Sequence, residues 1–230
     1  SREIRVSGYS NLVLESDQEP SILASLEAAK LERAEAIRLK KEETAAGEQA
    51  IAEESPVGEH QSNGEIENGI KSVQGQMRTL RLALQSRYRM RIKTDHPIMP
   101  WLIHHSAFLI GICRVGDDGR TAFERWKGKK VNRMLPEIGE CVYYLNPNSV
   151  GKDKLDPRWE NGIFVGLREE SGETFIGTNE GVIKVRSIRR KSSHSDRWSI
   201  EEFNQLKGTP WEPDPGRPGV EIGTRVRIPA

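Results

Sequence analysis

Gln61-Ser62-Asn63-Gly64-Glu65-Ile66-Glu67-Asn68 introduces the most regular helical pattern in the chain. The pattern continues as apolar residues at alternating steps of four and three, namely Ile66, Ile70, Val73, Met77, Leu80 and Leu84. This spacing brings one apolar side chain to the same face of a helix at each turn. The sequence therefore predicts a helix with a single buried face, and Glu67 lies in its first turn.

A second carboxylate, Asp17, lies upstream in a different setting. Leu12 to Leu14, within Asn11-Leu12-Val13-Leu14-Glu15-Ser16-Asp17, predict a short buried strand, so Asp17 follows the C-terminal end of that strand. A strand-end carboxylate facing a helix-start carboxylate suits a two-metal phosphoryl-transfer site, because each hard cation needs oxygen ligands and an open position. The pair therefore favours enzymes that cut or join polynucleotides.

Simpler roles remain open for both carboxylates. Asp17 also suits a turn, or a cap for the helix predicted after Pro20. The dipole of a helix favours an acid in its first turn, which accounts for Glu67 without a metal. An i,i+4 ion pair with Lys71 accounts for it equally well. Glu65 competes with Glu67, and composition alone does not separate the two.

The charge pattern indicates a polyanionic partner. The 230 residues carry a net charge of only +1. However, Lys71 to Lys93 contains seven Lys or Arg residues and no acid, and Lys184 to Arg197 adds six bases against Asp196 alone. By contrast, acids outnumber bases by eight to five from Glu27 to Glu54. Two basic blocks on a near-neutral chain are typical of a protein that binds nucleic acid.

Other classes of site have less support. Cys113 and Cys141 match no metal or redox spacing and favour a reducing compartment. No histidine pairs with them at zinc-finger spacing, so we expect no structural zinc. The apolar stretch Trp101 to Cys113 is too short to span a bilayer, and no signal peptide is visible. We expect a piece of a longer protein that is not secreted and has no membrane partner.

The chain divides into a helical half and a β-rich half. Residues 22–41 predict a helix with one apolar stripe, and Pro100 to Cys113 predict another. Thr121 and Glu124 form the sequence signature of a capping box, which predicts a short helix after the turn Gly116 to Gly119.

After Gly139, short β-branched or aromatic runs alternate with Gly, Asn and Pro. The runs are Cys141 to Leu145, Gly162 to Leu167, Glu173 to Gly177 and Val182 to Ile188. Their spacing predicts a small β-barrel or meander. From Gly208 onward, the high content of proline and glycine predicts a linker or a disordered tail.

The surroundings of Asp17 and Glu67 show a family pattern. Ser16-Asp17-Gln18-Glu19 before a predicted helix, and then Gln61 to Asn68, resemble the second half of a retroviral-type integrase core. The resemblance implies an RNase H-like fold with Asp17 as the second catalytic carboxylate and Glu67 as the third. It also implies that three carboxylates hold two Mg²⁺ or Mn²⁺ ions for 3′-end processing and strand transfer of DNA.

Later motifs follow in the order found in copia-type retrotransposon integrases. His96-Pro97, Trp101 and His105-Ser106-Ala107 resemble the late helix of the family core. Thr121 to Arg125, with Gly128-Lys129, resembles the family's threonine-proline-tyrosine-glutamate-arginine segment, although Ala122 replaces the proline. Lys154 to Pro157, with Gly162 to Gly166, resembles the small β-domain that follows the core in the polyprotein. The resemblance spans about residues 9 to 190.

The resemblance and the basic blocks together nominate residues that contact DNA. Lys71 matches the first family basic position beyond the third carboxylate, whereas Gln74 departs from the second. The basic blocks add candidates for phosphate contacts that read no base sequence: Arg78, Arg81, Arg186, Arg189, Arg190 and Lys191. The expected partners are the retroelement ends and target DNA, and a homo-oligomer is compatible with the pattern.

The family's first catalytic carboxylate has no counterpart before Asp17, because Glu3 and Glu15 are too close to supply it. We therefore expect an α/β protein with an incomplete RNase H-like integrase core, a small SH3-like β-barrel and a disordered tail. The expected ranges are 1–115 for the core, 116–138 for a linker with a short helix, 139–191 for the barrel and 192–230 for the tail.

We expect the isolated chain to be inactive, in a nuclear or cytoplasmic retroelement particle. Two alternatives remain. The first is a non-enzymatic remnant that binds nucleic acid, which the missing carboxylate favours. The second is a structural protein that binds a partner through the helix predicted over residues 22–41.

Overall fold

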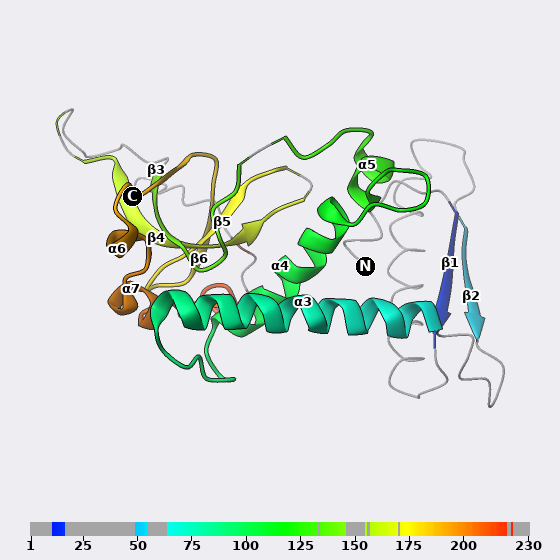
Figure 1. Ribbon diagram of the computed structural model, residues 1–230, viewed down its shortest axis with the longest axis horizontal. Helices are drawn as coiled ribbons and strands as arrows, with labels where there is room; N and C mark the ends of the chain where they lie inside the picture. Colours follow the sequence, from blue (N-terminus) through cyan, green and yellow to red (C-terminus); the bar gives the residue numbers. More distant parts are fainter. Residues whose placement is uncertain are drawn as a thin grey trace. The chain divides into compact units, whose positions relative to one another are not determined.

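The computed structural model describes residues 11–16, 49–54, 64–132, 134–145, 155, 157–169, 171–219 and 222. The chain divides into two compact units, Ser1–Lys71 and Ser72–Ala230. Figure 1 shows the helices and strands with the labels used below.

The first unit contains two parallel strands, β1 (Asn11–Ser16) and β2 (Gln49–Glu54). Leu12 pairs with Ala50 and Leu14 with Ala52. The strand predicted at Leu12 to Leu14 is confirmed, whereas the sequence pattern did not predict β2. Parallel strands need a long crossover connection, which here runs over residues 17–48. Asp17 and the helix predicted over residues 22–41 belong to that connection and lie outside the described residues.

Helix α3 (Gly64–Tyr88) confirms the predicted helix but not its fully buried face. Ile66 and Ile70 are 49% and 53% exposed, whereas Leu84 and Tyr88 are buried. The apolar stripe is therefore buried mainly toward the C-terminal end of α3, because the core that packs against α3 reaches only its C-terminal half.

Two further helices precede the sheet. Helix α4 (Ile98–Cys113) begins two residues before the predicted start, with Pro100 in its first turn, where no intrahelical bond from its nitrogen is needed. Helix α5 (Ala122–Lys127) has the predicted capping box. The Thr121 hydroxyl accepts from the Glu124 amide at 3.1 Å, and the Glu124 carboxylate accepts from the Thr121 amide at 2.8 Å.

A five-stranded antiparallel sheet has the order β6-β5-β4-β3-β7. Its strands are β3 (Cys141–Leu145), β4 (Trp159–Leu167), β5 (Thr174–Gly177), β6 (Val182–Val185) and β7 (Ile188–Arg190). The four predicted runs are confirmed as strands, with the last run divided between β6 and β7. The predicted barrel is corrected, since β6 and β7 form the two edges of an open sheet within the described residues.

The segment after the sheet is ordered through Gly219, in contrast to the predicted disordered tail over 192–230. It contains helix α6 (His194–Arg197) and helix α7 (Ile200–Asn204). Proline and glycine are frequent from Gly208 onward, but three apolar side chains that precede Gly208 anchor the segment in the core: Trp198, Phe203 and Leu206. The amide of Val182 at the edge of the sheet donates to the Pro213 carbonyl at 2.7 Å, which ties the segment down further.

One hydrophobic core joins helices and sheet in the second unit. Leu84 of α3 and Trp101 of α4 share a buried cluster with Val165 of β4 and Phe203 of α7. The Trp101 indole donates to the Gly208 carbonyl at 3.0 Å across this core. The chain therefore does not divide near residue 115, as the sequence suggested, because α4 packs directly on β4. The described elements establish a mixed α/β protein with a small open β-sheet.

The helices within the described ranges are all too short or too polar to cross a membrane. Both cysteines are free thiols, with Cys113 exposed and Cys141 buried. Burial raises the pKa of the Cys141 thiol to about 11, so this group is an inert part of the core at neutral pH.

Candidate nucleic-acid interface

The first turns of α3 place Glu67 and Lys71 side by side. The Lys71 ammonium lies 3.6 Å from a Glu67 carboxylate oxygen, and both side chains are more than half exposed. An exposed i,i+4 pair of this kind contributes only about 0.3–0.5 kcal/mol, so either group can exchange its partner for a ligand at little cost. The pair confirms the simplest of the roles considered for Glu67 and leaves its carboxylate open to solvent.

The family resemblance implies Asp17 and Glu67 as metal ligands, and of these two the structure describes Glu67. Asp17 and the Glu65 side chain lie outside the described residues. The choice between Glu65 and Glu67, and the separation of either from Asp17, therefore stay predictions. Among the residues that the structure describes, no three His, Cys, Asp or Glu side chains gather as metal ligands would. Glu67 alone does not form a metal site.

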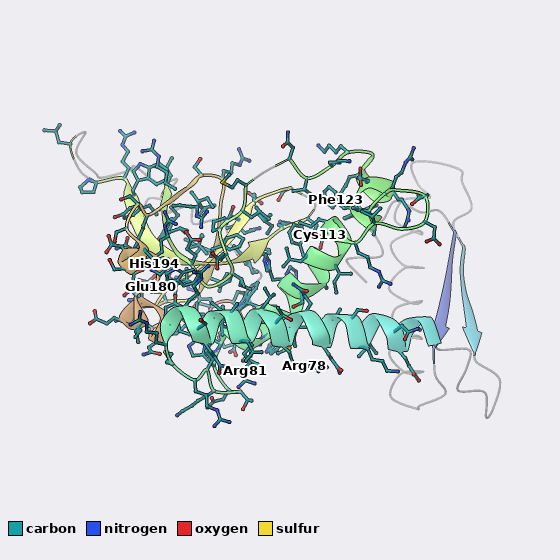
Figure 2. All side chains as sticks on the ribbon, in the orientation of Figure 1. Arg78, Arg81, Cys113, Phe123, Glu180 and His194 are labelled. Carbon is teal, nitrogen blue, oxygen red and sulfur yellow. The ribbon has the colours of Figure 1, made fainter. Side chains whose placement is uncertain are left out.

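Two arginines follow along the C-terminal half of α3. Arg78 is exposed, and its Nε donates to the Gln74 carbonyl one turn earlier at 3.2 Å. Arg81 is partly buried, and its guanidinium donates to the Ile92 carbonyl at 2.6 Å. Figure 2 shows both side chains on the same side of α3. Arg78 therefore presents its charge to solvent, whereas Arg81 fastens the following loop to the helix.

That loop carries three further cations that are not among the phosphate contacts predicted from the sequence. Arg89, Arg91 and Lys93 are all exposed after the end of α3. Arg89 adopts a left-handed backbone conformation with φ of 51°, which turns the chain away from the helix axis. The uninterrupted run of bases from Lys71 to Lys93 was the signal for them. Arg78 and this loop form the α3 basic surface, namely Arg78, Arg89, Arg91 and Lys93.

Arg186 and Arg189 form a second exposed basic surface, at the β6–β7 turn and on β7. Arg186 is 90% exposed and lies 4.0 Å from Glu173, a distance at which the ion pair is weak. The Arg189 guanidinium lies 4.5 Å from the ring centroid of Trp159 on β4. Stacking on the indole holds this guanidinium over the outer face of the sheet, where it remains available to an anion.

Arg190 and Lys191 are both held by carboxylates of this fold, and their role as phosphate contacts stays a prediction. Arg190 donates two hydrogen bonds of 2.7 Å to Glu140, whose side chain is fully buried. These bonds raise the pKa of the Arg190 guanidinium above its usual value. Lys191 is buried and donates to Glu202 at 2.9 Å. A run of bases in sequence does not show which of them have buried acidic partners.

The outer face of the sheet also contains an open hollow of about 560 Å³ beside Tyr143 and Asn161. Three acids, Asp196, Glu201 and Glu202, line it against one base, Lys191. An excess of carboxylates repels phosphate, so this hollow does not belong to the basic surfaces.

Comparisons of the chain with protein-family models, with curated proteins and with solved structures found no match. The class that the fold itself defines is therefore a mixed α/β protein whose exposed cations gather on α3 with its loop and on the β6–β7 side of the sheet.

Proposed function

We propose that this chain is part of a copia-type retrotransposon integrase, with inherited chemistry of metal-dependent 3′-end processing and strand transfer of DNA. The observation that carries the proposal is the parallel pairing of β1 with β2. Asp17 follows the last residue of β1 in sequence, and the carboxyl ends of parallel strands are where α/β enzymes hold reactive groups. The order of the sequence motifs supports the same proposal.

In the proposed role, Asp17 and Glu67 are two of three carboxylates that hold Mg²⁺ or Mn²⁺. When bound, such ions activate the attacking oxygen and stabilise the leaving oxygen of a phosphodiester. Lys71 lies one turn from Glu67 and is 71% exposed, so its ammonium holds a phosphate beside that carboxylate. The chain contributes two carboxylates at family positions, and we expect no strand transfer without a third.

A second candidate, a nucleic-acid-binding remnant without catalysis, is favoured by the exposed cations. Within the described residues, Arg78, Arg186 and Arg189 reach solvent without a close ion pair, and the exposed Arg89, Arg91 and Lys93 follow the end of α3. Phosphate contacts of this kind need no metal. Both candidates place the protein with DNA, in the nucleus or in a cytoplasmic particle.

The two candidates differ in how DNA binding depends on a divalent ion. We would measure the affinity of the full chain for labelled branched DNA by fluorescence anisotropy, in Mg²⁺, in Mn²⁺ and in EDTA at constant ionic strength. The integrase proposal predicts tighter binding with Mn²⁺, and Asp17→Asn and Glu67→Gln each remove that gain. Glu65→Gln, which makes the same change two residues away, keeps it.

The remaining outcomes are equally informative. Salt-sensitive binding that ignores the divalent ion in all four proteins would favour the remnant. A loss of the gain in Glu65→Gln alone would move the third carboxylate to Glu65. Strand transfer by the chain alone, abolished by Asp17→Asn, would contradict the need for a third carboxylate. No DNA binding at low salt would contradict both candidates.

A further inference from the structure

Helix α5 and the turn before it carry more positive charge than their own acids neutralise. Arg114 to Lys130 contains six Lys or Arg residues and three acids. Asp118 accepts two hydrogen bonds from Arg125, at 2.6 and 2.9 Å, which hold the pKa of Asp118 well below its usual range. Glu124 caps α5 and lies 3.7 Å from Lys130. Asp117, the third acid in this segment, is exposed and takes part in neither of these interactions.

Four cations remain over after this internal pairing, namely Arg114, Arg120, Lys127 and Lys129. Arg114 directly follows the last residue of α4, and the other three are here termed the α5 cation cluster. Arg120 and Lys129 are exposed. The Lys127 ammonium lies 3.6 Å from the centroid of the Trp126 ring, and Phe123 meets Trp126 edge-on at 6.3 Å. The indole therefore holds the Lys127 charge in place instead of leaving it on a freely moving side chain.

Several contacts hold the backbone that carries the α5 cation cluster. The capping box fixes the first turn of α5, and Gly128 ends the helix with φ of 68°. An isolated bridge joins Val115 to Thr121, and α5 contacts α4. In Figure 2, Phe123 lies near Cys113 at the end of α4. Charges fixed before binding lose less conformational freedom when a ligand arrives.

We propose that the α5 cation cluster is a third contact surface for the phosphates of DNA, distinct from the α3 and β6–β7 surfaces. The inference rests on the proposed DNA binding and adds a site to it. The cluster combines two freely exposed cations with a third held by an indole, which suits a phosphate backbone and gives no means of reading bases.

The test compares two double variants that lose the same charge. Lys127→Gln with Lys129→Gln removes most of the cluster. Lys207→Gln with Arg217→Gln removes two exposed cations from the C-terminal segment. Thermal unfolding first establishes that both variants retain the fold. The dependence of DNA affinity on salt is then measured for both and for the unchanged chain, with duplex DNA.

The cluster variant is expected to bind more weakly and to lower the steepness of the plot of log affinity against log salt by about 2, since each phosphate contact contributes about 0.9. The C-terminal variant is expected to match the unchanged chain. Equal slopes in all three proteins would overturn the assignment to α5 while leaving DNA binding intact. Absence of DNA binding in the unchanged chain would instead overturn the proposed function.

Discussion

The buried carboxylate of Glu140 shows how one residue can decide the role of its neighbours. It is 0% exposed and accepts two hydrogen bonds from Arg190 and one from the Glu137 amide at 3.1 Å. Removing the charge of Glu140 leaves Arg190 and Arg197 without the buried carboxylate that they share. We predict that Glu140→Gln lowers the free energy of unfolding by about 3 kcal/mol.

A matched change is available on the surface. Glu137 forms a bidentate ion pair with Arg87, and both side chains are more than 40% exposed. Glu137→Gln should cost less than about 1 kcal/mol, because solvent screens such pairs. Urea unfolding of both variants measures the difference, and equal losses would contradict the structural role given to Glu140.

His105 should make the fold sensitive to mild acid. The imidazole is buried between Phe108 and Phe164, and burial, with a smaller contribution from the charge of His104, lowers the pKa of His105 to about 4. The unfolded chain binds a proton near pH 6.5, whereas the folded chain resists it until about pH 4. The contribution of the neutral His105 to stability is therefore fully present above pH 6.5 and is lost as the pH falls toward 4.

The size of this effect follows from the shift in the pKa of His105, which corresponds to about 3 kcal/mol over that pH range. His105→Leu, which cannot titrate, should show a smaller loss of stability between pH 6.5 and pH 4 than the unchanged chain. Denaturant unfolding at both pH values makes the comparison. An NMR titration that placed the pKa of His105 above 6 would contradict the burial of this ring.

Single residues also show which features local sequence patterns determine. The capping role of Thr121 and the strand at Cys141–Leu145 follow from local patterns, because the partners lie within a few residues. The opposite fates of Arg189 and Arg190 do not. Adjacent residues on a strand point to opposite faces, and only the tertiary fold shows that Arg190 meets a buried acid.

At the scale of elements, the C-terminal segment is the strongest departure from the sequence prediction. The Tyr88 ring lies 5.4 Å from Trp198 and 4.2 Å from Phe203, so α3 and α7 depend on each other for burial. We predict that a chain ending after Lys191 loses cooperative unfolding, because removing three buried apolar side chains costs more than about 6 kcal/mol.

A chain ending after Ile222, whose side chain packs against the core, is the matching control and should unfold as the full chain does. Calorimetry of the two shortened chains makes the test. Cooperative unfolding by the shorter chain would contradict the role of residues 192–219 in the core and support the tail predicted from the sequence.

Gly208 offers a finer test of the same segment. Its φ is 87°, and a Cβ there would overlap the Pro213 carbonyl oxygen. Its own carbonyl accepts the Trp101 indole hydrogen bond. Gly208→Ala should therefore destabilise by about 2 kcal/mol or more. Gly75→Ala, in open space within α3, should instead stabilise by up to about 1 kcal/mol. Thermal unfolding distinguishes the two signs.

At the scale of the whole molecule, the sequence predicts the elements better than their assembly. Local periodicity is enough to place α3 and the strands of the five-stranded sheet, but it does not predict β2 or show that Leu84 and Phe203 share one core. That contact joins helices and sheet into one unit and removes the expected boundary near residue 115. The open sheet has the same origin, since closure depends on how β6 and β7 meet.

The candidate site divides along the same line. The charge runs predicted Arg78, Arg186 and Arg189 as phosphate contacts; all three are exposed, and the contacts themselves stay predictions. The charge runs did not show that Arg81 donates a hydrogen bond to the loop after α3, because its acceptor is the carbonyl of Ile92, eleven residues away. The role of Asp17 stays a prediction.

The most direct measurement of the central claim is the salt dependence of DNA binding by the full chain. Lys71, Arg78, Arg186 and Arg189 alone give a slope of about −3.6 for log affinity against log salt on duplex DNA, and contacts from the α3 loop and the α5 cation cluster make the slope steeper. Arg78→Gln and Arg186→Gln should each reduce that steepness by about 0.9. A slope near zero, or no binding at about 50 mM salt, would contradict the assignment of these surfaces to DNA.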